Sequence, residues 1–80
     1  MSEYYTAISK GVTVKLDYDG GENVIYFGET IPGTAVSKSF WRIRKFTYDG
    51  NDNVTDIKWA NANALTFTVK WDDRATYTYS

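Results

Sequence analysis

The stretch VTVKLDYDGGENVIYFG, residues 12–28, decides the fold class because it reads as two strands joined by a tight turn. Every second side chain from Val12 to Tyr18 is apolar, and this period of two predicts a strand with one buried face. The Asp-Gly pair within residues 19–22 is a strong signal for a short hairpin turn. Residues 24–27 are apolar on both faces, which predicts a strand covered on both sides, by a second layer or by a partner.

The same patterns continue along the chain. Further strands are expected over residues 40–48, 54–60, 65–71 and 75–80, with turns at 49–53 and 61–63. The alternation is clearest over 65–71, and no window of ten residues keeps a helical period. The sequence therefore predicts one all-β domain over residues 1–80, a small antiparallel sandwich or open barrel of six to seven strands in hairpin order.

Two segments point to contacts with other chains. Residues 29–39 break the strand pattern and contain the single proline, Pro32, so we expect a loop or arm there. The expected last strand, residues 75–80, carries little charge beyond Arg74. Such an edge is poorly protected against pairing, which predicts that a neighbouring subunit covers it.

Length and composition limit how the fold is stabilised. A chain of 80 residues is near the lower size limit for an independent core, and the absence of cysteine excludes disulfides. The 18% aromatic content predicts an aromatic core, oligomerisation or both. No apolar run approaches the length of a membrane span, and residues 1–5 do not resemble a signal peptide, so we expect a soluble, unsecreted protein.

The residue types argue against catalysis. The chain has no histidine and no cysteine, so a Ser/His/Asp or Cys/His nucleophile cannot form. Adjacent acids such as Asp72 and Asp73 are typical of turns. Asp49, Asn51 and Asn53 alternate like the start of a calcium loop, but that motif requires Gly at position six and Glu at position twelve, and neither is present. We therefore expect no enzyme activity, no metal and no cofactor.

Arginines and tryptophans are the candidate binding side chains. Arg42 and Arg44 share one strand face, whereas Lys45 points the other way, and the net charge is −1. Arginine pairing across an interface, or a solvated face, is therefore favoured over nucleic-acid binding. The three tryptophans could form a platform for sugars, but their positions on expected core strands favour burial.

A series of short motifs runs from residue 26 to residue 80. It comprises Tyr26-x-Gly28-Glu29, Pro32-Gly33-Thr34, Trp41-x-Ile43-x-Lys45, Thr47-Tyr48-Asp49, Trp59-Ala60-Asn61 and Trp71-Asp72-Asp73-Arg74-Ala75. In their order, these motifs resemble a family of short uncharacterised proteins of tailed bacteriophages. The chain departs from the family pattern at Asn61 and Ala62, where an acidic residue and a glycine are expected. The resemblance implies a phage origin and a virion component, and it carries no catalytic residues.

The resulting hypothesis is a phage virion structural protein, a capsid decoration protein or a component of a head or tail appendage such as a tail fibre. It would be made in the host cytoplasm and assemble with itself, as a homo-oligomer such as a trimer, and with other virion proteins, without membrane contact. The candidate contact residues are Pro32, Trp41, Arg42, Arg44, Tyr77 and Tyr79. The alternative is a host-directed module that binds a receptor or carbohydrate, or inhibits a bacterial protein.

Overall fold

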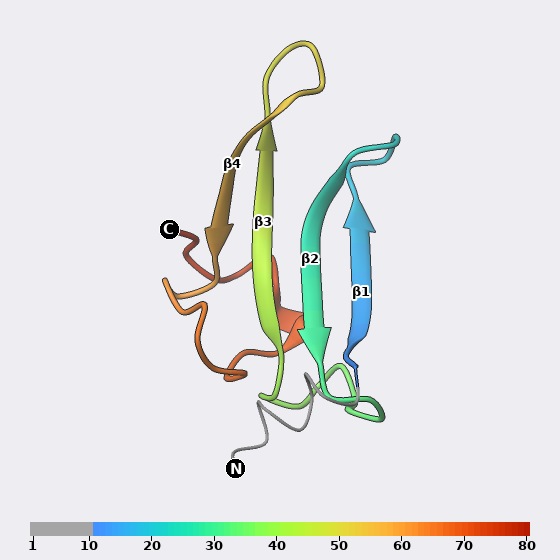
Figure 1. Cartoon of the computed structure of the whole chain (residues 1–80), viewed down its shortest axis with the longest axis vertical. Coiled ribbons are helices and arrows are strands. Elements are labelled where there is room, and N and C mark those ends of the chain that lie inside the picture. The colour runs from blue at the N-terminus through green and yellow to red at the C-terminus, as the bar shows by residue number, and fades with distance from the viewer. Residues whose placement is uncertain (1–10) are drawn as a thin grey trace.

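The computed structural model describes residues 11–80, which form an all-β fold around one antiparallel sheet. The strands are β1 (Thr13–Tyr18), β2 (Val24–Thr30), β3 (Arg42–Tyr48) and β4 (Val54–Trp59), and they lie in the order β1-β2-β3-β4 (Figure 1). A short 3-10 helix, η1 (Trp71–Asp73), follows. The expected all-β class is confirmed. The prediction that residues 1–5 do not form a signal peptide concerns residues outside the described range 11–80.

Aspartates shape the turns of the two outer hairpins. The Asp19 amide donates to Asn23 O over 3.0 Å, and the Asp49 amide donates to Asn53 O over 2.9 Å. Each aspartate also accepts a backbone N–H two residues ahead through its own Oδ1, at 2.8 Å in both turns. Asp and Asn favour turns because their side chains hydrogen-bond the local backbone in this way. The turns expected at 19–22 and 49–53 are confirmed.

The core lies on one face of the sheet, which we call the covered face. The segment after β4 passes behind the sheet in Figure 1 and packs there. Trp41 and Val69 exchange backbone hydrogen bonds of 2.8 and 3.0 Å, which fasten this segment to the start of β3. The buried hydrophobic side chains are Trp41, Ile43, Ala60, Val69 and Trp71.

Gly28 makes room for this packing. A Cβ atom on Gly28 would lie 2.5 Å from Cε3 of Trp71 and 3.2 Å from Cε3 of Trp41. The two indole rings are 5.8 Å apart and tilted by 40°, so they meet over the bare backbone of β2. Any side chain at this position would force the rings off the sheet.

The strand count of six to seven, and a sandwich or barrel, are not confirmed. Within residues 11–80, the segments 65–71 and 75–80 are irregular and pair through single bridges, Val69 with Trp41 and Tyr79 with Ala60. The C-terminal segment still pairs with the end of the edge strand β4, because Trp59 and Ser80 exchange backbone hydrogen bonds of 3.0 and 3.1 Å. Residues 78–80 thus pair with the end of β4 along one side, and cover of their other side by a neighbouring subunit stays a prediction.

Local hydrogen bonds explain why residues 65–71 do not form a ladder. Asn61 and Ala62 adopt positive φ values of 54° and 56°. Asn63 Oδ1 then accepts the N–H groups of Leu65 and Thr66 at 3.1 and 3.2 Å, so these donors are bonded locally. Such side-chain to backbone bonds compete with strand pairing.

The segment expected as a loop or arm at residues 29–39 is partly strand. Glu29 and Thr30 belong to β2, and the connection to β3 runs over residues 31–41. The middle of this connection is held by hydrogen bonds within the chain. Trp41 Nε1 donates to Ala35 O at 3.0 Å, and the Asp72 amide donates to Val36 O at 3.1 Å.

Candidate functional site: the open sheet face

The sheet face opposite the core carries a continuous set of side chains from all four strands. Residues paired directly across strands share a face, and Leu16, Phe27, Arg44 and Trp59 form one such row. Flanking rows pair Glu29 with Val14 and Arg42, and Phe46 with Ile57. We call this surface the open face; it consists of Val14, Leu16, Phe27, Glu29, Arg42, Arg44, Phe46, Ile57 and Trp59.

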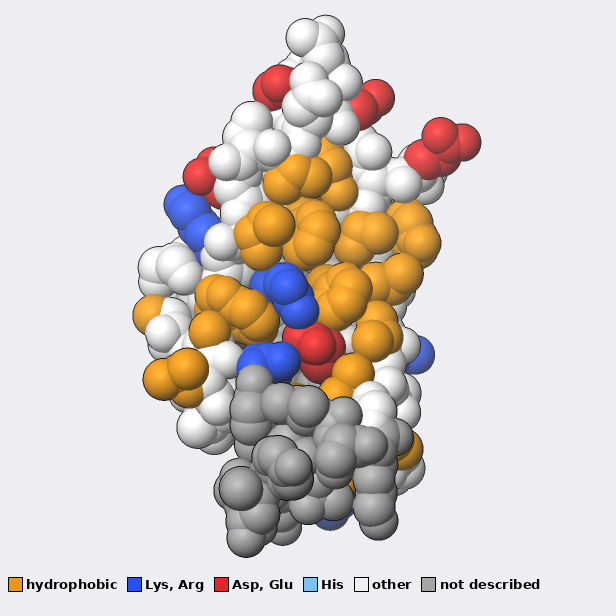
Figure 2. All heavy atoms as spheres, viewed as in Figure 1, with side chains coloured by type: hydrophobic (Ala, Val, Ile, Leu, Met, Phe, Trp, Pro, Cys, Tyr) orange, Lys and Arg blue, Asp and Glu red, His pale blue; other side chains and the backbone are white. Residues whose placement is uncertain are grey.

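Large apolar side chains remain exposed on this face. Val14 is 44% exposed, Leu16 is 42% exposed and Ile57 is 51% exposed. In Figure 2, hydrophobic side chains gather over the strands, next to basic and acidic side chains. The prediction that the apolar side chains of β1 are buried is therefore wrong. The C-terminal segment packs on the other face, where Gly28 provides space.

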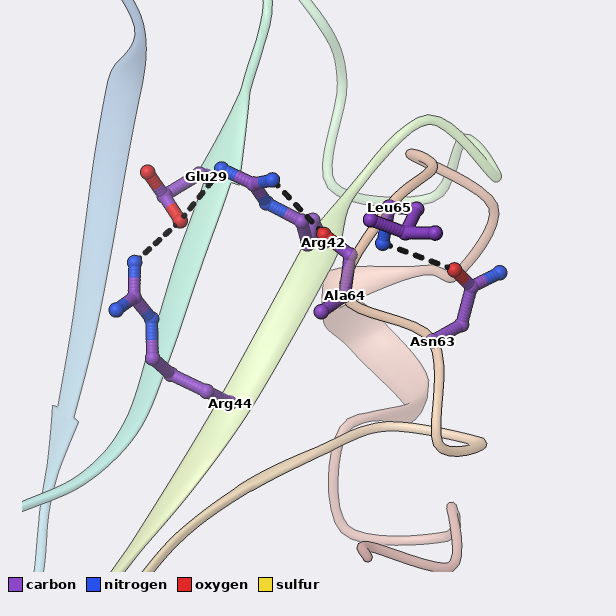
Figure 3. A network of polar contacts seen from close by, with 6 residues as sticks. All are labelled: Glu29, Arg42, Arg44, Asn63, Ala64 and Leu65. Atoms are coloured by element: carbon purple, nitrogen blue, oxygen red, sulfur yellow. Dashed lines mark hydrogen bonds and ion pairs between the residues drawn. The ribbon is translucent and has the colours of Figure 1, made fainter.

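A three-residue ionic cluster lies on β2 and β3, the two middle strands of the open face. Arg44 Nη2 donates to Glu29 Oε1 over 2.6 Å, and Arg42 Nη2 donates to the same oxygen over 3.3 Å. Arg42 Nη1 also donates to Ala64 O over 2.9 Å, which ties the cluster to the segment after β4 (Figure 3). The Glu29 side chain is only 12% exposed, so the shared carboxylate is shielded from water.

Aromatic rings hold the two guanidinium groups in place. Arg44 Cζ lies 4.5 Å from the ring centre of Phe27 and 4.7 Å from that of Trp59. Arg42 Cζ lies 5.2 Å from the Trp59 ring and 5.0 Å from the Phe67 ring. These distances fit cation–π contacts. Because both arginines occupy the Trp59 ring, this tryptophan does not resemble an empty platform for a sugar.

The structure divides the candidate contact residues among three places. Arg42 and Arg44 lie on the open face and meet Glu29, while Pro32 is exposed in the β2–β3 connection. Trp41 is 1% exposed, in the core, so burial is confirmed for it as it is for Trp71. Tyr77 and Tyr79 are half-buried and pack against the core.

The two tyrosines make specific hydrogen bonds on the covered face. The Lys70 amide donates to the Tyr77 hydroxyl over 2.9 Å, and the Tyr79 hydroxyl donates to Arg74 O over 2.7 Å. Burial is the main cause that raises the pKa of the Tyr79 phenol above its ordinary value, and the neighbouring Tyr26 and Tyr77 add to it. Tyr79 therefore stays neutral as a donor in this fold.

Sequence reasoning missed Glu29, Phe27 and Leu16 as members of one surface. A signal for Phe27 was present, because residues 24–27 are apolar on both faces and a strand of that kind needs two covers. The described chain supplies the cover on one face only. The sequence pattern places Glu29 in the loop at 29–39, so it does not predict the position of Glu29 opposite Arg42.

Asp49, in the turn between β3 and β4, is engaged in local structure. Asp49 accepts the amides of Asn51 and Asn53, and these hydrogen bonds lower the pKa of its carboxyl. Within residues 11–80, no three His, Cys, Asp or Glu side chains form a group that could hold a metal ion. No helix in this part of the chain is long and apolar enough to cross a membrane.

Comparisons of the chain with protein families, curated proteins and solved structures find no match.

Proposed function

We propose that this protein is a structural component of a bacteriophage particle and acts by assembling with other subunits. It is a decoration protein of the capsid or part of a head or tail appendage, it reaches the virion from the host cytoplasm, and it catalyses no reaction. The motifs between residues 26 and 80 support the phage origin through their family resemblance. In this proposal, the sandwich expected from the sequence forms between subunits.

The open face is the observation that carries the assembly function. Leu16 and Ile57, on opposite edge strands, are each more than two-fifths exposed. A monomeric protein rarely exposes a contiguous apolar surface of this kind, and such surfaces mark interaction sites. The arginines and aromatic rings at its centre are side chains that are enriched in protein interfaces.

Quantitative mass spectrometry of purified virions tests this proposal. The chain is expected among the particle proteins, at a copy number that follows the symmetry of the capsid or of the tail. Its absence from particles, together with its presence in infected cells, would contradict the virion proposal. That result would favour the alternative, a host-directed binding module.

A further inference from the structure

The open face has an apolar area that its own described chain does not bury. On the covered face, the pair Gly28 and Ile43 lies beneath two tryptophans, and Ile43 is 0% exposed. On the open face, the β1 side chains Val14 and Leu16 lack such a layer and remain 44% and 42% exposed. The sheet thus has one buried face and one face with exposed apolar side chains around an ionic cluster.

The polar centre of this face is complementary to itself. Within residues 11–80, Glu29 Oε2 and Arg44 Nη1 have no hydrogen-bond partner, although both side chains are joined through Oε1 and Nη2. Glu29 Oε2 is an acceptor, and Arg44 Nη1 is a donor. Two open faces related by a two-fold axis bring the donor of each copy to the acceptor of the other, which is the requirement of an isologous interface.

The size of the face also fits a second copy. Four strands about 4.8 Å apart and six residues long at about 3.4 Å each give a face of about 400 Å². Two such faces total about 800 Å² in projection, which is below the range of stable specific interfaces and fits a weak dimer. A dimer of this size is expected to depend on concentration in the micromolar range.

We propose that the open face packs against the open face of a second copy, so that two four-stranded sheets form one sandwich. Leu16, Phe27, Phe46 and Ile57 form the apolar layer between the sheets, about 10 Å thick. Each Arg44 contacts the Glu29 of the other copy as well as its own, which keeps every carboxylate and guanidinium in the interface paired. This inference deepens the proposed assembly function and rests on it.

Light scattering coupled to size-exclusion chromatography of the full chain, from about 1 to about 200 µM, tests the inference. The wild type is expected to change from monomer to dimer over this range. Leu16→Lys and Ile57→Lys place a charge in the interface, and each is expected to raise the dissociation constant at least about tenfold. Two variants on different strands keep the test valid should one of them fail to fold, which circular dichroism reports.

Thr13→Lys is the matched control. It adds a lysine to the same strand as Leu16→Lys, but Thr13 is paired with the buried Thr30 and therefore lies toward the other face. Its dissociation constant is expected to equal that of the wild type. A wild type that stays monomeric at about 200 µM overturns the inference.

An oligomer that both Leu16→Lys and Ile57→Lys leave intact also overturns the inference, because the interface then lies elsewhere. That result leaves the proposed assembly function standing. Absence of the chain from virions would contradict the proposed function, whereas a dimer measured in solution would still support the inference about the open face.

Discussion

Arg44 and Glu29 lie on neighbouring strands and are joined by a 2.6 Å contact between Nη2 and Oε1. Arg42 contacts the same oxygen at 3.3 Å, so one carboxylate is shared by two arginines. Glu29→Gln removes the negative charge and leaves two shielded guanidinium groups side by side. We expect a loss of about 2 kcal/mol in the free energy of unfolding, measured by urea denaturation.

Glu22→Gln is the control for this substitution. Glu22 is exposed in the β1–β2 turn, so the same chemical change is expected to alter stability by less than about 0.5 kcal/mol. If Glu29→Gln changed stability as little as Glu22→Gln, the ionic cluster would not contribute to the fold.

Gly28→Ala is expected to destabilise the protein by about 2 kcal/mol or more, because its methyl group would overlap the Trp71 ring. Gly50→Ala provides a matched comparison, since a Cβ atom on Gly50 would meet no atom within 4 Å. The difference between the two variants in urea midpoint isolates the contact with the tryptophans. Equal midpoints would contradict the packing of both rings over Gly28.

Tyr79→Phe tests the buried phenol. The substitution removes the hydrogen bond to Arg74 O and is expected to cost about 1 kcal/mol at neutral pH. The folded state raises the pKa of Tyr79, so its contribution to stability is full below the ordinary value of 10.0 and is lost as pH rises above it. The wild type should lose stability above pH 10, and Tyr79→Phe should lose less. Tyr18→Phe, at an exposed position, should follow the wild type in thermal unfolding across this range.

Asp49→Asn tests the turn between β3 and β4. The folded state lowers the pKa of Asp49 through the amides of Asn53 and Asn51. The contribution of this carboxylate is therefore full above its unfolded value of 3.8 and is lost as pH falls through the lower folded value. Between about pH 5 and pH 2, the unfolding temperature of Asp49→Asn should fall less than that of the wild type. Asp72→Asn, outside this turn, is the control, and an equal decrease in both variants would argue against the hydrogen bonds at Asp49.

Part of this fold follows directly from the sequence. Alternation over residues 12–18 and the Asp-Gly turn predict the first hairpin, because both signals are local. The faces of β3 are also predicted correctly: Ile43 is buried, whereas Arg42 and Arg44 share the opposite face. The choice of which sheet face is covered was not predictable, because it depends on contacts between Gly28 and a ring more than forty positions away.

The segment after residue 64 follows the predicted alternation only in part, and its secondary structure differs from the prediction. Val69 and Trp71 are buried and Thr68 is exposed, as alternation predicts, but Leu65, expected on the same buried face, is 82% exposed. The backbone nevertheless forms only one bridge, because the Asn63 side chain takes up the amides of Leu65 and Thr66. Period-two alternation therefore does not by itself predict strand pairing, which depends on where the amide hydrogens bond.

The position of the core's cover in the chain has a consequence for synthesis. All four strands precede Val69 and Trp71, so a ribosome produces the entire sheet before the segment that buries it. Until this last segment is in place, the covered face of the sheet lacks Val69 and Trp71, and its apolar side chains are open to capture by chaperones or by another copy.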